Sequence, residues 1–232
     1  MINFSYGQII SYGEMCFKEG RSLQNGMHFH VKRGYSIFLM NKAANAPYED
    51  REECDGKILI YEGHDAGKSP NLPNPKVVDQ PEYFIRSLTA NGKFYQAAQK
   101  CKQNQITEMV KVYEKIKPGI WVFNGYFKLL DAWKEQRNGR MVFKFKLEIE
   151  PENDLRCEQE QVSLNFSRMI PSAVKREVYA RDKGQCVVCG SRENLHFDHI
   201  LPFSKGGTSL KAENIQLLCA KHNLEKSNTF KY

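Results

Sequence analysis

Two closely spaced pairs of metal-ligand residues lie near the end of this 232-residue chain. The first pair is the CxxC of Cys186 and Cys189, and the second is the CxxH of Cys219 and His222. Three thiolates and one imidazole form a ligand set for tetrahedral Zn²⁺. A redox CxxC would not need a second pair at the same spacing. The pattern therefore predicts a structural zinc site that ties two segments of the chain together.

The other cysteines do not indicate a disulfide framework. The total of seven is odd, and the remaining four are scattered at Cys16, Cys54, Cys101 and Cys157. No apolar run approaches the roughly 18 residues of a membrane span, and the N-terminus has no signal pattern. We therefore expect an intracellular, cytoplasmic protein with no membrane partner.

Charge and composition divide the chain. Of a formal net charge of +7, residues 166–232 carry most of the excess, which fits a polyanionic partner. The acidic, polar segment 148–160 contains a proline and separates a strand pattern from a helix pattern. We expect a first domain at 1–150, an acidic linker at 151–166 and a second domain at 167–232.

The first domain has mostly the pattern of strands. Short apolar runs bounded by turn residues predict strands at 34–40 and 56–63, and alternation of apolar and charged residues predicts another at 141–150. Two stretches, 92–103 and 107–116, fit helical or mixed structure.

A long loop and a helix complete the predicted elements. The stretch 64–80 is rich in Gly, Pro, Asn and Asp, which predicts a loop. Apolar residues recur at helical spacing in 170–184, where Pro171 suits a first helical turn and Gly184 suits a C-terminal cap.

The segment around the two ligand pairs, CVVCGSRENLHFDHILPFSKGGTSLKAENIQLLCAKHNLEK, resembles an HNH nuclease domain of the ββα-metal fold, from about Pro171 to Lys226. The resemblance implies that His199 is the general base that activates water and that Asp198 binds a catalytic Mg²⁺ or Mn²⁺. It also implies that Asn214 holds the loop and orients the base.

The last HNH position leaves two assignments open. Asn223 matches the place where the family often has His, so it would be a second ligand of the catalytic metal, whereas His222 could instead be that letter. The CxxH spacing favours His222 as the fourth zinc ligand. Lys226 follows three residues after Asn223 on the same helix face, where it either contacts phosphate or is a solvated surface lysine. His196 could belong to the site, or it could be a strand residue that points away from the site.

Several segments before the linker, in order, resemble the SRA (YDG) domain: GYSIFLM, PYEDREECDGKILIYEGHD, DQPEYFIRSLTANGKFYQAA, WVFNGYFKLLDAW and VFKFKLE. The resemblance implies an α+β protein whose first domain is an SRA/PUA-like twisted β-barrel with helices. It implies a reader that flips modified cytosine out of double-stranded DNA.

The resemblance also suggests a base pocket. Tyr48 and Tyr61 match the two aromatic residues that enclose the base, although each is equally an ordinary strand aromatic. Either Asp50 or Glu52 would accept a hydrogen bond from the cytosine amine. Glu62 replaces a small hydroxyl residue of the family.

Two segments are candidates to enter the DNA during flipping. One is the loop 64–80, and the other is 26–34. The second carries four residues that surface charge alone could also explain, namely His28, His30, Lys32 and Arg33.

We therefore predict a modification-dependent DNA endonuclease, a restriction-type phosphodiester hydrolase that reads 5-methylcytosine or 5-hydroxymethylcytosine. Cleavage of both strands needs two active sites, so we expect a homodimer. One alternative is a non-catalytic DNA-binding protein that keeps a zinc-stabilised HNH fold. Another is an HNH nuclease whose first domain reads another base or a specific sequence.

Overall fold

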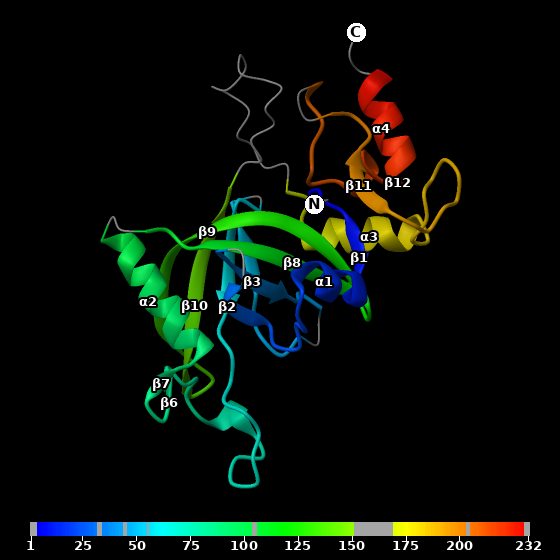
Figure 1. The fold of residues 1–232 in the computed structure, drawn as a ribbon. Coiled ribbons are helices and arrows are strands. Elements are labelled where there is room, and N and C mark those ends of the chain that lie inside the picture. The colour runs from blue at the N-terminus through cyan, green and yellow to red at the C-terminus, as the bar shows by residue number, and fades with distance from the viewer. Residues whose placement is uncertain are drawn as a thin grey trace. The chain divides into compact units, whose positions relative to one another are not determined.

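The computed structural model describes residues 4–31, 34–43, 46–54, 56–103, 106–150, 169–202 and 205–229 (Figure 1). The predicted linker at 151–166 and the candidate residues Lys32 and Arg33 lie outside these ranges. The α-helices are α1 (Tyr12–Glu19), α2 (Ala90–Lys102), α3 (Ser172–Arg181) and α4 (Ala220–Thr229). The strands are β1 (Ile9–Ser11), β2 (Met27–Val31), β3 (Tyr35–Met40), β4 (Arg51–Glu53), β5 (Ile58–Glu62), β6 (Tyr83–Phe84), β7 (Ser87–Leu88), β8 (Met109–Lys117), β9 (Ile120–Arg137), β10 (Arg140–Ile149), β11 (Leu195–His199) and β12 (Ile215–Cys219).

The predicted α+β class is confirmed. The large sheet has the strand order β2-β3-β8-β9-β10-β5-β4, and β1 pairs with β9. Two further antiparallel pairs, β11-β12 and β6-β7, form small sheets of their own. None of the helices in the described ranges is long and apolar enough to cross a bilayer. The twisted barrel form of the first domain stays a prediction.

Contacts within the chain divide it into two compact units. The sheet unit consists of residues 21–113 and 126–150, and the C-terminal unit consists of 1–20, 114–125 and 151–232. Strands β8 and β9 therefore contribute residues to both units. The sequence patterns do not indicate that the first 20 residues and the β8–β9 turn belong with the C-terminal part, and the predicted domain bounds stay a prediction.

An aromatic cluster forms the interior of the sheet unit. The ring of Phe38 stacks on Tyr61 with centroids 4.2 Å apart and lies 4.6 Å from Phe94 of α2, which also contacts Phe145 of β10. Helix α2 packs on β2 and β10 through this cluster. The Oγ1 of Thr89 accepts a hydrogen bond from Gly92 N–H and caps the helix.

The expectation of helical or mixed structure at 107–116 is wrong, because most of this stretch is strand β8. Its charged residues would suit the exposed face of a helix, but Lys111 and Glu114 are buried in the strand. The ammonium of Lys111 lies 4.1 Å from the ring centroid of Tyr35, and Glu114 forms an ion pair with Lys175. Tertiary partners for both charges allow β-branched Val110 and its neighbours to form a strand here.

The C-terminal unit is built on the β11–β12 hairpin with α3 and α4 around it. Backbone groups near the N-terminus extend this hairpin, since Phe197 N–H donates to the Gly7 carbonyl (3.1 Å) and Gln8 forms a β-bridge with His196. The Gly7 N–H in turn donates to the Phe123 carbonyl (3.0 Å). One core joins these segments, with Val122, Ile170, Val174, Val178, Phe197, Ile215 and Leu217 among its buried residues.

Candidate functional site

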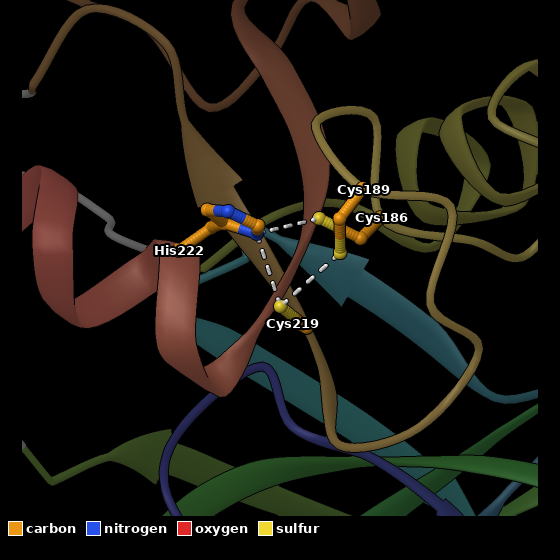
Figure 2. Close-up of side chains that lie close together, drawn as sticks. All are labelled: Cys186, Cys189, Cys219 and His222. Carbon is orange, nitrogen blue, oxygen red and sulfur yellow. Dashed lines mark hydrogen bonds between the residues drawn. The ribbon is translucent and has the colours of Figure 1, made fainter.

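The four predicted zinc ligands lie together (Figure 2). Cys186 and Cys189 lie in the turns between α3 and β11, Cys219 ends β12, and His222 lies in the first turn of α4. Gly190 follows the first pair with a φ of 73°, a conformation that glycine adopts without strain. Local turns and element ends therefore direct four ligand atoms to one point.

The spacing of these atoms fits a tetrahedral metal ion. All four lie within 4.8 Å of one another. The sulfurs of Cys189 and Cys219 are 3.8 Å apart, and Nδ1 of His222 lies 3.2 Å from the Cys219 sulfur and 3.4 Å from the Cys186 sulfur. Zn–S bonds of about 2.3 Å and Zn–N bonds of about 2.0 Å imply S···S edges of about 3.8 Å and S···N edges of about 3.5 Å. The residues present thus suit Zn²⁺.

The environment of Cys186 favours its thiolate. Burial would raise the pKa of this thiol, but hydrogen bonds from the backbone N–H groups of Cys219, Cys189 and Val188 outweigh it. A hydrogen bond with His222 acts in the same direction, and the pKa falls from 9.0 to about 6. The thiolate is the form that binds a metal.

Asp198 and His199 are the last two residues of β11. Asp198 lies opposite Gln216 of β12 and accepts a hydrogen bond from its Nε2 (3.3 Å). The ammonium of Lys226, on α4, forms an ion pair with the same Asp198 oxygen and donates to the His199 carbonyl. A side-chain cation is therefore already bound to the carboxylate that we predict as a ligand of the catalytic metal.

Two polar side chains hold the chain that follows β11. Nε2 of His199 lies 2.8 Å from Oγ of Ser209, so the hydroxyl fixes the ring orientation. The Oδ1 of Asn214 accepts from Leu201 N–H (2.8 Å), and its Nδ2 donates to the carbonyls of Leu201 (3.1 Å) and Thr208 (3.0 Å). Asn214 thus ties together the two ends of the loop, and the role that the HNH resemblance implies for it stays a prediction.

Gly207 fits inside this loop because it has no side chain. An added Cβ would lie 1.9 Å from the Leu201 carbonyl oxygen and 2.8 Å from Nδ2 of Asn214. Its N–H donates to the Pro202 carbonyl (3.1 Å). The glycine thus allows the loop to close beside His199.

Asn223 and Lys226 lie three residues apart on α4 and so share one face of the helix. Because Lys226 contacts Asp198, this face is directed toward the end of β11. The helix that carries His222, a predicted zinc ligand, thus also carries Asn223 and Lys226. The assignment of Asn223 to a catalytic metal stays a prediction.

The two predicted base-stacking tyrosines have different environments. Tyr61 is buried, stacks on Phe38, and its hydroxyl donates to the Gly26 carbonyl (3.1 Å). Tyr48 is half-buried, and its ring stacks on His64 with centroids 5.2 Å apart at 12°. The ring centroid of His64 is also 6.3 Å from that of Tyr61. His64, rather than Tyr61, is the ring stacked on Tyr48.

Burial keeps His64 neutral. Its pKa falls from 6.5 to about 4, chiefly because burial disfavours the imidazolium. Nε2 of His64 lies 3.2 Å from the Tyr61 hydroxyl. A Cβ at Gly26 would approach Nε2 of His64 to 2.7 Å, so a glycine is needed beside this ring.

The two candidate carboxylates, Asp50 and Glu52, have different partners. Glu52 pairs with Lys42 at 2.8 Å. The carboxylate of Asp50 accepts backbone N–H bonds from Asn41 (3.2 Å) and Glu62 (3.1 Å). Burial nevertheless raises the Asp50 pKa from 3.8 to about 7. Which of these two carboxylates contacts a base stays a prediction.

Glu62, the departure from the family pattern, is buried within a group of cations. Its Oε2 accepts from Lys144 (3.0 Å) and Arg137 (2.5 Å). Among the described residues, its Oε1 has no hydrogen-bond partner. The sequence shows that Glu62 replaces a small hydroxyl residue of the family, but it does not indicate the ion pairs of Glu62 with Lys144 and Arg137.

Of the two segments expected to enter DNA, 64–80 is mainly loop with one short 3₁₀ turn (Pro75–Val77). Most of 26–34 is strand β2 (Met27–Val31), and its entry into DNA stays a prediction. There His28 is buried and His30 pairs with Glu108 (2.8 Å). Cross-strand pairing with β3 explains the extended conformation.

The sequence patterns miss His64, Asn91 and Gln80. The Asn91 side chain accepts from His64 N–H (2.8 Å) and donates to the carbonyls of His64 (2.8 Å) and Pro81 (3.1 Å). Gln80 donates to the Gly63 carbonyl (2.7 Å). Polar residues beside glycine in YEGHD and TANG are the only signal of these contacts in the sequence.

The HNH endonuclease family model matches residues 186–229. This range contains all four clustered metal ligands together with Asp198, His199 and Asn214, and the predicted HNH resemblance is confirmed there. A search of curated protein sequences finds no significant match to the chain.

Solved structures similar to this chain include SRA domains and a nuclease. The SUVH5 SRA domain with hemi-methylated CG DNA is 24% identical, with 65% of this chain and 87% of that chain covered and a TM-score of 0.41. The SUVH5 SRA domain bound to fully hydroxymethylated CG DNA is 21% identical over the same shares, also at 0.41. The DNA modification-dependent restriction endonuclease AspBHI is 13% identical, with 60% and 67% covered and a TM-score of 0.41.

Proposed function

We propose that this protein is a modification-dependent DNA endonuclease, in which the C-terminal unit hydrolyses phosphodiester bonds and the sheet unit reads 5-methylcytosine or 5-hydroxymethylcytosine. The observation that carries the proposal is the HNH match at 186–229 around Asp198 and His199. Zn²⁺ held by the Cys₃His group would stabilise the fold. The net charge of +7 suits a DNA partner.

In this proposal His199 takes a proton from a water molecule whose oxygen attacks phosphorus, and Ser209 keeps the His199 ring oriented. The phosphorus–oxygen bond to the leaving sugar oxygen then breaks, and that oxygen takes a proton from solvent. Mg²⁺ or Mn²⁺ held by Asp198 and Asn223 would neutralise charge on the phosphate. Binding of such a metal would release Lys226 from the Asp198 carboxylate, and the ammonium of Lys226 could then contact a phosphate oxygen.

The reader part of the proposal rests on the SRA resemblance and on the aromatic group around Tyr48. A flipped base would stack on Tyr48, and His64 would move from its stacked position to admit it. Asp50 would accept a hydrogen bond from the exocyclic amine of the base. Two copies of the chain would cut the two strands, so we propose a homodimer on DNA.

The test is a cleavage screen. Matched duplexes carry cytosine, 5-methylcytosine, 5-hydroxymethylcytosine or glucosylated 5-hydroxymethylcytosine, each with Mg²⁺ or Mn²⁺. We expect cleavage of a modified duplex only, and a loss of at least about a hundredfold for His199→Ala because the general base is removed. The control for His199→Ala is Lys221→Ala, an exposed change on α4 that leaves the general base in place.

The outcomes separate the parts of the proposal. Equal cleavage of modified and unmodified DNA would exclude the reader. Unchanged cleavage by His199→Ala would exclude the HNH mechanism. Tight binding of modified DNA without cleavage in either metal would support the non-catalytic alternative.

A further inference from the structure

The ammonium of Lys226 contacts two oxygen atoms at the end of β11. It forms an ion pair with Oδ2 of Asp198 and donates a hydrogen bond to the backbone carbonyl of His199. Carboxylate and carbonyl oxygens are the ligand types that Mg²⁺ and Mn²⁺ take in proteins. Lys226 therefore supplies a positive charge at a place whose oxygen atoms also suit a divalent cation.

Both oxygen atoms have neighbours that hold them in place without the ammonium. Nε2 of Gln216 donates to the same Oδ2 of Asp198 (3.3 Å). The peptide group that contains the His199 carbonyl is held as well, because its N–H, at Ile200, donates to the Asn214 carbonyl (2.7 Å). We therefore expect the two oxygen atoms to keep their positions when the ammonium moves away.

Lys226 is a long, flexible side chain on a helix whose backbone is fixed. Helix α4 begins directly after Cys219 and contains His222, both ligands of the predicted zinc site, and it packs on β11 and β12 (Figure 1). A lysine carries its charge on a flexible stem of four carbons. The side chain of Lys226 is 19% exposed, so its ammonium can turn toward solvent while the helix stays in place.

An ammonium and a divalent cation compete for one carboxylate. Two cations beside the same oxygen atom repel each other, and the metal affinity of a site falls in proportion to the fraction of molecules in which the site is open. Lys226 thus lowers the metal affinity of the free protein. A phosphate oxygen of DNA is another strong acceptor for the ammonium, and it removes this competition.

We propose that Lys226 is a latch that keeps the catalytic metal from Asp198 in the free protein, and that DNA opens the latch by offering a phosphate oxygen to the ammonium. The metal site then forms only on DNA. Metal and DNA bind cooperatively, and each raises the affinity for the other by the same factor. This inference deepens the proposed function and rests on it, because it takes Asp198 as a ligand of the catalytic metal.

The test measures Mn²⁺ binding with and without DNA. Electron paramagnetic resonance is recorded on the full-length protein loaded with Zn²⁺, alone and with a short duplex that carries 5-methylcytosine or 5-hydroxymethylcytosine. Mn²⁺ bound by the duplex alone is subtracted. All proteins carry His199→Ala so that the duplex stays uncut, and this protein is the reference. The test variant adds Lys226→Met, and the control adds Lys221→Met, which removes one exposed charge from the same helix.

Without DNA, we expect Lys226→Met to bind Mn²⁺ about tenfold more tightly than the reference protein, because no ammonium competes for Asp198. The factor by which the duplex raises Mn²⁺ affinity should be about tenfold smaller in Lys226→Met, since its site is already open. Lys221→Met should match the reference protein in both measurements. Fluorescence anisotropy should show that Mn²⁺ raises the DNA affinity of the reference protein by the same factor.

Unchanged or weaker Mn²⁺ binding without DNA, by a Lys226→Met protein that retains its Zn²⁺, would overturn the latch. An equal effect of DNA on the Mn²⁺ affinity of both proteins would do the same. The coupling in the reference protein needs no Lys226 variant, so independent binding of Mn²⁺ and DNA overturns the latch even where Lys226→Met does not fold.

Failure of the latch is distinguishable from failure of the proposed function. Cleavage of modified DNA by the parent protein, with no coupling between Mn²⁺ and DNA, removes the latch and leaves the endonuclease. Coupling that Lys226→Met reduces, in a protein whose parent cuts no duplex, supports the latch and contradicts the endonuclease.

Discussion

The carboxyl group of Asp50 has a pKa close to neutral pH. Burial raises its pKa from 3.8 to about 7, although two backbone N–H groups donate to it. The folded state therefore binds a proton more tightly than the unfolded state does. Between pH 4 and 7, the Asp50 contribution to folding stability decreases as pH rises.

We predict that Asp50→Asn removes this part of the pH dependence. The free energy of unfolding of the variant, relative to that of the parent protein, should rise by up to about 4 kcal/mol from pH 4 to pH 7.5. The amide also loses one backbone hydrogen bond, which adds a cost that does not depend on pH. Urea unfolding at several pH values measures the difference, and a constant difference would show that Asp50 does not titrate in this range.

A buried ion pair holds α3 against strands β8 and β9. Lys175 donates to Glu114 (2.8 Å) and to Oδ1 of Asn124 (2.7 Å), and both charged side chains are fully buried. Although burial alone would raise it, the pKa of Glu114 is lowered because Lys175 and its hydrogen bonds stabilise the carboxylate. This contact attaches α3 to the end of β8 and the start of β9.

We predict that Lys175→Met destabilises the C-terminal unit by about 3–5 kcal/mol, because it leaves the Glu114 carboxylate buried without its partner. Combining it with Glu114→Leu should recover much of the loss, since two apolar side chains replace the pair. Urea unfolding of the single and double variants measures both effects. Additive losses in the double variant would contradict the coupling.

If the Cys₃His group binds Zn²⁺ as we propose, it will determine how the molecule responds to metal removal. Three cysteines and His222 close the C-terminal unit, whereas the aromatic cluster of Phe38 and Phe94 supplies a separate interior in the sheet unit. Metal binding to such a site contributes directly to folding free energy. The two units should therefore respond differently when the metal is removed.

We predict that chelation, or Cys189→Ser, removes amide hydrogen-exchange protection from β11 and β12 while β5 and β10 stay protected. Cys54→Ser, at an exposed cysteine outside the cluster, is the control and should change neither. Loss of protection in both units together would show that the metal supports the whole chain. Unchanged protection in β11 and β12 would exclude a structural role for the metal.

The sequence by itself determined the features that depend on local spacing. The pairs CxxC and CxxH bring ligand atoms within reach through single turns, and Asp198-His199 needs no distant partner to be recognised. Short apolar runs bounded by turn residues likewise predicted the strands around 34–40 and 56–63, and alternation of apolar and charged residues predicted the strand around 141–150.

Only the tertiary structure decided the contacts between residues far apart in the sequence. It stacked His64 on Tyr48, paired Lys226 with Asp198, and placed residues 1–20 and the β8–β9 turn in the C-terminal unit. It also made β8 a strand, by providing partners for Lys111 and Glu114. The physical reason is that non-local contacts depend on which elements pack together, and a periodic pattern does not encode that choice.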